Sequence, residues 1–216
     1  DPSVFYQLLR HGLKEGQLPR VIPMGGSSPL GAVGYVNAAF ELNDQIMRGE
    51  IPEPDYIYIA SGSMGTAAGL ILGLRAINMK TKVVAVRVNS ERFVNVKGLI
   101  KLINKTNFLL SSVDPSFPHF KFRETDVEIR QGFFGTQYAL STEAGMEAMS
   151  LMNRYGAIKL DGTYTGKTFA ALIDDAKTLN LRNKVLLFWH TYNSLDFSET
   201  IDTIDYHQLP RCYHLY

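Results

Sequence analysis

Short apolar runs alternate with longer amphipathic stretches along most of the chain. The runs at 56–60, 82–88 and 184–189 are rich in β-branched and aromatic residues and have the length of strands. They are apolar almost throughout rather than at every second position, which is typical of strands covered on both faces of a parallel sheet. A further short strand is expected at 127–129, after a loop over 111–125 that carries two prolines.

The stretches between these runs have the spacing of helices. In one of them Tyr35, Ala38, Ala39, Leu42 and Ile46 recur at intervals of three and four residues, so that they share one face. The same pattern predicts helices over 4–9, 32–47, 65–78, 94–110, 142–155 and 166–179. Strands that alternate with helices predict an α/β fold of three layers, with a largely parallel sheet and helices on both of its faces.

Composition fits one large domain or slightly more. The 216 residues are 45% hydrophobic and 20% charged, which is ordinary for a globular protein. The 22 Lys and Arg residues against 21 Asp and Glu residues leave a net charge of +1, so we expect no nucleic-acid partner. No apolar run approaches the about 18 residues of a membrane-spanning helix, so we expect no membrane partner. The chain starts at Asp1, directly before an amphipathic stretch, and is therefore expected to be a piece of a longer protein.

Cysteine and histidine usage argues against a metal centre. The lone cysteine, Cys212, excludes an internal disulfide framework and a zinc cluster built on thiolates. It suits a reducing compartment, and we expect a cytoplasmic protein. The five histidines lack the paired spacing of a zinc-binding helix, and they stand at positions 11, 119, 190, 207 and 214.

A glycine-rich loop, Ser61-Gly62-Ser63-Met64-Gly65-Thr66, separates a predicted strand from a predicted helix. Backbone N–H groups without bulky side chains, two hydroxyls and the positive end of a helix together would form a cradle for an anion such as phosphate. The Lys-Ser/Thr ending of a P-loop is absent, which disfavours nucleotide triphosphate hydrolysis. On spacing alone, the loop fits equally a strand-to-helix turn whose glycines serve only packing.

Two other loops also precede predicted helices. The segment 23–31 contains Ser27 and Ser28 before Pro29, which is a sufficient helix-start signal, so by itself it is interpreted as a structural turn. The segment 160–167 offers the phenol of Tyr164 and the amine of Lys167. Without further context, these two side chains fit a half-buried aromatic residue and a solvated residue of the first helical turn.

Taken in order, four segments resemble one known family. It comprises the pyridoxal-phosphate enzymes of the D-cysteine desulfhydrase and 1-aminocyclopropane-1-carboxylate deaminase type, which share the tryptophan synthase β-like fold. Residues 22–36 look like the family's interdomain glycine segment and 61–70 like its phosphate loop. Residues 160–167 resemble its catalytic-tyrosine segment, and 188–191 its last strand. Four matches in one order over about 170 residues make the resemblance specific.

This resemblance implies pyridoxal 5′-phosphate as cofactor, a small amino acid as substrate and a homodimer as the full-length assembly. It implies a phosphate site formed by Gly62, Ser63, Met64, Gly65 and Thr66. It also places a hydroxyl from Thr165 or Thr191 at the pyridine nitrogen and makes Tyr164 a catalytic acid or base. We expect Tyr164 at a helix N-terminus, whose partial positive charge would lower the pKa of the phenol from about 10.

The resemblance also implies how the chain is divided. Residues 1–20 would be the end of the small domain, and 21–216 the large cofactor-binding domain. The family has a further N-terminal portion, with a Gly-Asn-Lys segment whose lysine forms the Schiff base and a serine that lies against the cofactor; neither segment occurs in this sequence. Lys167 does not replace that lysine, because the family has a lysine here in addition to it. We therefore expect this chain alone to be inactive.

A second departure lies at Thr191-Tyr192-Asn193, where the family usually continues Thr-Gly-Gly. A bulky Tyr192 would narrow the pocket or redirect the loop. The deaminases have glutamate after the tyrosine, whereas desulfhydrase-like members have threonine, and this chain has Thr165. A hydroxyl leaves the pyridine ring closer to neutral than a carboxylate does, which favours β-elimination over opening of a cyclopropane ring.

The leading hypothesis is therefore the C-terminal part of a D-cysteine desulfhydrase-like lyase or deaminase. It would eliminate sulfide or ammonia from a small amino acid. A 1-aminocyclopropane-1-carboxylate deaminase is the near alternative. A non-catalytic phosphate-binding module or a degenerate enzyme fragment is the alternative from another class.

Overall fold

The computed structural model describes residues 2–193 and 195–208 and contains one four-stranded sheet. Its strands are β1 (Tyr56–Ser61), β2 (Lys82–Arg87), β3 (Glu128–Arg130) and β4 (Leu186–Phe188), in the order β3-β2-β1-β4. Every neighbouring pair is parallel. The carboxyl ends of all four strands therefore lie at one edge of the sheet, where ligands bind in open α/β folds.

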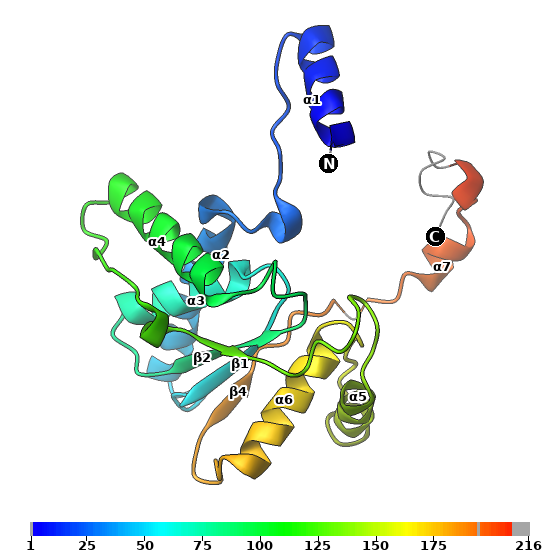
Figure 1. Ribbon diagram of the computed structural model, residues 1–216. Coiled ribbons are helices and arrows are strands. Elements are labelled where there is room, and N and C mark those ends of the chain that lie inside the picture. Colours follow the sequence, from blue (N-terminus) through cyan, green and yellow to red (C-terminus); the bar gives the residue numbers. More distant parts are fainter. Residues whose placement is uncertain (1, 194, 209–216) are drawn as a thin grey trace.

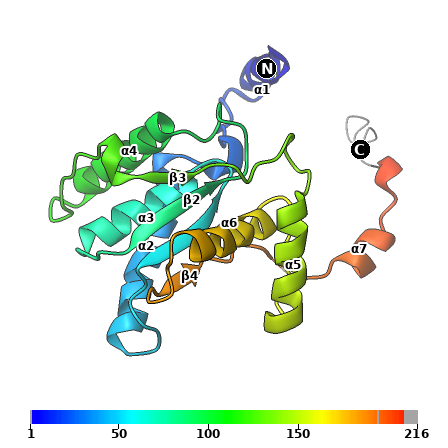
Figure 2. The ribbon, with the colours of Figure 1, turned by 60° about the horizontal axis from the view of Figure 1, so that its bottom comes forward.

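Helices separate the strands along the chain, as the sequence predicts (Figure 1). They are α1 (Pro2–Glu15), α2 (Pro29–Met47), α3 (Gly65–Ala76), α4 (Val96–Val113), α5 (Glu143–Gly156), α6 (Thr165–Thr178) and α7 (Ser198–Asp202). Short 3-10 turns stand at Met24–Gly26, Glu124–Asp126 and Tyr206–Gln208. The expected three-layer arrangement is confirmed, because α6 lies on the opposite side of the sheet from α2, α3 and α4 (Figures 1 and 2).

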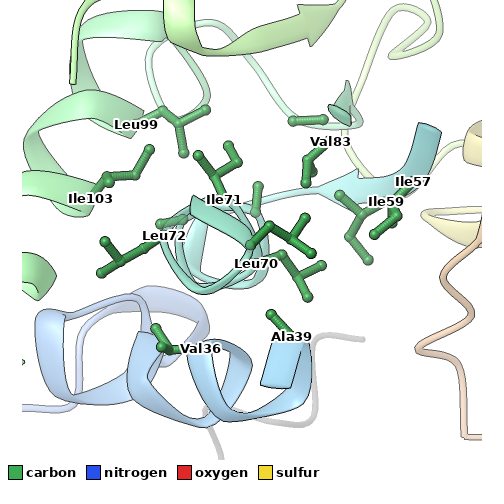
Figure 3. Close-up of a cluster of buried hydrophobic side chains, with 14 of the residues drawn as sticks. Val36, Ala39, Ile57, Ile59, Leu70, Ile71, Leu72, Val83, Leu99 and Ile103 are labelled. Atoms are coloured by element: carbon green, nitrogen blue, oxygen red, sulfur yellow. The ribbon is translucent and has the colours of Figure 1, made fainter. Parts of the chain in front are cut away.

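The larger core lies between the sheet and helices α2, α3 and α4. Gly69 and Gly73 bring α3 close to α2, since a Cβ on Gly73 would stand only 2.6 Å from the Cβ of Ala39. Full burial of each large aliphatic side chain stabilises the fold by about 1.5–3 kcal/mol. Figure 3 shows members of this core from five elements, namely Val36, Ala39, Ile57, Ile59, Leu70, Ile71, Leu72, Val83, Leu99 and Ile103.

The smaller core lies between the sheet and α6, and it contains a polar cluster. The hydroxyl of Tyr58 on β1 donates to Asp175 of α6 at 3.0 Å, and Nε of Arg130 on β3 donates to the same carboxylate at 2.8 Å. Asp175 is buried, so these bonds offset the cost of removing its charge from water. The cluster holds α6 at a fixed position over β1 and β3.

Helix starts follow the signals in the sequence. The hydroxyl of Ser28 accepts from the N–H of Gly31 at 3.0 Å, and Pro29 opens α2. Thr142 caps α5 in the same way through the N–H of Gly145 at 3.1 Å. The expected limits were less accurate, because α4 runs on to Val113 and the last strand is only three residues long.

Helix α1 stands apart from the body of the domain and is joined to it by 16–23 (Figure 1). Its exposed apolar side chains include Phe5, Leu9 and Leu13. This placement supports a domain boundary near residue 20, which stays a prediction.

Two kinds of feature are absent from the described residues, namely membrane-spanning helices and clusters of metal-ligating side chains. Among the described residues, none of the helices combines the length and apolar character needed to cross a membrane. The same residues contain no cluster of three or more metal-ligating side chains. Cys212 and His214 lie outside the described part of the chain.

Candidate functional site

The glycine-rich loop lies at the carboxyl edge of the sheet, between β1 and α3. Residues 62–66 are half-buried, so the loop is accessible from solvent rather than enclosed in the core. Met64 precedes α3 in a left-handed conformation with φ +71°, and α3 starts at Gly65 as expected. The first N–H groups of a helix have no acceptor within the helix and carry its partial positive charge. The loop therefore presents an anion cradle to the edge of the sheet.

The segment 24–28 packs directly against this loop. The hydroxyl of Ser27 donates to the hydroxyl of Ser63 at 2.8 Å and accepts from the N–H of Gly65 at 3.1 Å. A Cβ on Gly25 would stand 2.2 Å from Oγ of Ser63, so glycine is needed for this approach. The structural turn predicted here is present, but no local sequence pattern indicates its contact with the glycine-rich loop.

Tyr164 lies on the other side of the loop, at the N-cap of α6 as expected. Its ring lies next to Gly62, where an added Cβ would stand 3.1 Å from Cε1 of the tyrosine. The glycine-rich loop is thus placed between Ser27 and Tyr164, which come from segments far apart in the sequence.

A second phenol, Tyr138, accompanies Tyr164. The two hydroxyls are hydrogen-bonded, and the rings meet edge to face with centroids 6.1 Å apart. Tyr138 stands in the irregular segment 131–142, which has no strand or helix periodicity. Sequence reasoning missed it, because only the tertiary contact identifies it.

The expected lowering of the pKa of Tyr164 is wrong. Burial, the hydrogen bond with Tyr138 and the nearby carboxylate of Asp161 raise the pKa of Tyr164 to about 12. These effects outweigh the partial charge of the helix N-terminus, because a half-buried phenol beside a carboxylate resists becoming an anion. The phenol is therefore protonated at neutral pH.

Asp161 organises the start of α6. Its carboxylate accepts from the N–H groups of Thr163, Tyr164 and Thr165 at 2.8–2.9 Å. It also accepts from the hydroxyl of Thr165 at 2.6 Å, while the N–H of Asp161 donates to that hydroxyl at 2.8 Å. Burial opposes ionisation, but the hydrogen bonds from Thr165 and the backbone outweigh it and lower the pKa of Asp161. The hydroxyl of Thr165, one of two candidates for the pyridine nitrogen, is thus held by Asp161.

Thr191, the other candidate, is exposed just beyond β4 at the same edge of the sheet. The chain reaches it by pairing with β1, since the N–H of Trp189 donates to the carbonyl of Tyr58 at 2.9 Å. Tyr192, which stands where the family usually has glycine, tilts against the ring of His190 with centroids 6.4 Å apart. Nδ1 of His190 is buried without a hydrogen-bond partner among the described residues.

Lys167 is not the solvated residue that its place in the first helical turn suggests. It is 0% exposed, and Nζ donates to the carbonyl oxygen of Phe134 at 2.7 Å. The amine also stands over the ring of Phe134, 5.6 Å from its centroid. Burial lowers the pKa of Lys167, although the charge of Asp161 opposes this. The lysine thereby ties the segment that carries Tyr138 to α6.

The predicted site residues fall into three groups. Gly62 and Tyr164 are in contact, and the rest of the 62–66 loop adjoins them. Thr165 is turned toward Asp161, and Thr191 lies at the same edge after β4. A cavity of about 630 Å³ lies elsewhere, beside the residues where β2 and β3 begin, and includes none of the predicted site residues.

The chain is similar to known proteins in sequence and in fold. The family described as pyridoxal-phosphate dependent enzyme matches residues 6–191. The D-cysteine desulfhydrase of Serratia proteamaculans (strain 568) is 33% identical over 178 residues, which cover 82% of this chain and 51% of that protein. The D-cysteine desulfhydrase of Salmonella paratyphi C (strain RKS4594) is 33% identical over 196 residues, covering 88% and 56%.

A solved structure shows the same fold. The crystal structure of an ACC deaminase homologue is 31% identical and superposes with a TM-score of 0.69, covering 85% of this chain and 52% of that one. The chain thus spans about half the length of the curated relatives it matches. Its three-layer architecture is the tryptophan synthase β-like fold that the sequence resemblance implied. Since the family match extends over most of its length, the chain belongs to the family of pyridoxal-phosphate dependent enzymes.

Proposed function

We propose that the complete protein is a pyridoxal-phosphate dependent lyase or deaminase that acts on a small amino acid, with D-cysteine as the leading substrate. The observation that carries this proposal is the position of the glycine-rich loop. It presents the N-terminus of α3 at the carboxyl edge of the sheet, directly beside the protonated phenol of Tyr164. The similarity to two D-cysteine desulfhydrases supports the choice of substrate.

The residues at the edge fit the cofactor. Its phosphate would be held by N–H groups and hydroxyls of Gly62, Ser63, Met64, Gly65 and Thr66. The hydroxyl of Ser61 is 1% exposed and has no partner among the described residues, so a polar group at the end of β1 remains unsatisfied. A phosphate-bearing ligand at this edge would bring further polar groups to it.

For the pyridine nitrogen we propose Thr191 in preference to Thr165. Thr191 is exposed at the edge, whereas the hydroxyl of Thr165 already donates to Asp161. When bound, the cofactor supplies an electron sink for the carbanion that forms at Cα of an amino acid. A hydroxyl rather than a carboxylate at the nitrogen suits elimination of a good leaving group such as sulfide.

Tyr164 would serve as a hydrogen-bond donor in this reaction. Its pKa of about 12 keeps the phenol protonated at neutral pH, so it can hold the substrate and stabilise charge on a departing sulfur through a hydrogen bond. Tyr138 orients the phenol through the bond between the two hydroxyls. We therefore expect removal of the hydroxyl of Tyr164 or of Tyr138 to lower turnover more than it lowers retention of the cofactor.

Two alternatives rest on specific observations. The solved structure of an ACC deaminase homologue favours 1-aminocyclopropane-1-carboxylate as substrate. Tyr192, which stands where the family usually has glycine, favours a non-catalytic phosphate-binding module. The coding sequence upstream of Asp1 separates the enzyme from the module, because a Gly-Asn-Lys segment in frame supports the enzyme and a coding sequence without one supports the module.

The assay uses the complete protein loaded with pyridoxal phosphate. Release of sulfide from D-cysteine, with little ammonia from 1-aminocyclopropane-1-carboxylate, is the expected result. Faster ammonia release from the cyclic amino acid would overturn the choice of substrate. For the chain of 216 residues alone we expect neither product.

The cellular context follows from the same hypothesis. We propose a cytoplasmic homodimer, because the lone Cys212 suits a reducing compartment and the family resemblance implies two copies. Light scattering after size-exclusion chromatography of the complete protein measures its mass directly. A monomer at micromolar concentration would contradict the dimer.

A further inference from the structure

The hydroxyl of Ser27, which lies outside the glycine-rich loop, is hydrogen-bonded to two polar groups of the loop. Ser27 stands 36 residues before Ser63 in the sequence, yet their hydroxyl oxygens are 2.8 Å apart. Its oxygen is also 3.1 Å from the N–H nitrogen of Gly65, at the first residue of α3. A single side chain thus contacts both a hydroxyl and a backbone N–H of the proposed phosphate site.

The direction of these hydrogen bonds matters for an anion. The oxygen of Ser27 accepts from the N–H of Gly65, and its hydroxyl donates to the hydroxyl oxygen of Ser63. Among the hydrogen bonds of the described residues, the hydrogen of the Ser63 hydroxyl has no acceptor, so it is available to a ligand. A hydroxyl that accepts a hydrogen bond is also a better donor, since chains of hydrogen bonds polarise one another.

Close packing keeps Ser27 in this position. A Cβ on Gly65 would stand 2.7 Å from Oγ of Ser27, and a Cβ on Gly25 would stand 2.2 Å from Oγ of Ser63. Both positions need glycine for the two segments to approach. The hydroxyl of the neighbouring Ser28 instead caps α2 by accepting from the N–H of Gly31.

We propose that Ser27 is a positioning residue of the phosphate site. It turns the hydroxyl of Ser63 toward the ligand as a donor and, by accepting from the N–H of Gly65, fixes the backbone at the start of α3. A phosphate group has only acceptor oxygens at neutral pH, so its affinity depends on donors that already point toward it. This inference rests on the proposed function, since it concerns the phosphate of the same cofactor.

The test measures binding to the complete protein, freed of bound cofactor, by fluorescence titration. The probe is pyridoxine 5′-phosphate, which has no aldehyde and therefore cannot condense with lysine amines. Ser27→Ala is expected to weaken its binding by about tenfold, the value of one charge-assisted hydrogen bond. Ser27→Thr, which keeps the hydroxyl, is expected to restore most of the affinity.

Ser28→Ala is the matched control. It removes a hydroxyl one residue away and a helix cap, so it is expected to lower the melting temperature while leaving the affinity within about twofold. Titrations are made well below the melting temperature of each variant, so that every chain is folded. Pyridoxine without the phosphate shows whether an effect is directed at that group.

Each outcome bears on the proposal. Equal affinities of the unaltered chain and Ser27→Ala would overturn the role of Ser27 and leave the phosphate site intact. An equal loss with Ser28→Ala, or an equal loss for pyridoxine, would also overturn it, because the effect would then not be specific to the phosphate. Absence of saturable binding to the unaltered chain would overturn the phosphate site in this chain, and this inference with it.

Discussion

The hydroxyl of Tyr138 is hydrogen-bonded to the hydroxyl of Tyr164, although the two residues come from different segments. Tyr164 is fixed by the N-terminus of α6, whereas Tyr138 belongs to a segment without regular structure. The hydrogen bond therefore joins a phenol at the end of a helix to a phenol in a segment that is held only by its tertiary contacts. This difference gives the two tyrosines distinct expected phenotypes.

Tyr164→Phe is expected to lower turnover of the complete, cofactor-loaded enzyme by about a hundredfold or more, because it removes the proposed hydrogen-bond donor to the leaving group. The cofactor spectrum should stay unchanged. Tyr155→Phe is the control, since Tyr155 is 76% exposed at the end of α5. Unchanged turnover of Tyr164→Phe would leave this tyrosine with a packing role only.

Tyr138→Phe is expected to lower the pKa of Tyr164 from about 12 toward its ordinary value of 10, since after burial the hydrogen bond between the two hydroxyls and the charge of Tyr138 are the next causes of the shift. Burial and Asp161 remain, so the pKa should stay above 10. Ultraviolet difference spectroscopy of this variant against the double variant with Tyr164→Phe isolates the titration. A pKa unchanged by the substitution would contradict the assigned cause.

Asp161→Ala is expected to destabilise the fold by about 1–2 kcal/mol, because three N–H groups at the start of α6 lose their acceptor. The pKa of Asp161 is lowered in the folded state, so its stabilising effect is complete above the ordinary value of 3.8. That effect is lost as the pH falls through the lower, folded-state pKa.

Urea denaturation of both proteins measures this contribution as the difference in unfolding free energy. The difference should be constant from neutral pH down to about 5 and shrink below about 4. Glu53→Ala, at an exposed loop position, provides a comparison for the general loss of a carboxylate. A difference that grows on acidification would contradict the assignment.

Lys167→Met is expected to loosen the segment that carries Tyr138. It keeps most of the apolar stem but removes the donor to the carbonyl of Phe134. A hydrogen bond from a charged donor is worth about 1.5–3 kcal/mol, so amide exchange around Phe134 should quicken by about tenfold or more. Hydrogen exchange with mass spectrometry measures this. Lys177→Met, on the exposed last turn of α6, should leave that exchange unchanged.

Gly25 and Gly26 form a matched pair, because both have φ +63°. Alanine at either position costs about 1–2 kcal/mol for a left-handed backbone. Only at Gly25 does the added Cβ also meet Oγ of Ser63, whereas Gly26 has no neighbour within 4 Å. Gly25→Ala should therefore weaken pyridoxine 5′-phosphate binding and Gly26→Ala should not. Equal affinities of the two variants would contradict the close approach.

The fold was largely predictable because local patterns carry it. The β-branched runs at 56–60 and 82–88 became the two central strands, and the period of 32–47 became α2. The last strand was predicted too long, since only residues 186–188 pair in register with β1, although the N–H of Trp189 still donates to Tyr58. Pattern indicates which residues favour a strand, but only tertiary pairing decides how many of them join the sheet.

The site was predictable only in part. The glycine-rich loop and Tyr164 have local signatures, because each precedes a helix. Ser27 and Tyr138 have none, since their partners are distant in the sequence. The burial of Lys167 was predictable from helical spacing, because Lys167 shares a helical face with Ala170 and Ala171, which are buried as well.

The placement of the glycine-rich loop has a consequence for folding. Its contact with Ser27 closes a loop of 36 residues, and its contact with Tyr164 closes one of about 100 residues, each at an entropic cost that grows slowly with length. Both contacts join segments from different parts of the chain. Binding of the phosphate would therefore indicate that β1, α2 and α6 are assembled. A ligand at one hundred times its dissociation constant would add about 2.7 kcal/mol to the stability of the whole domain.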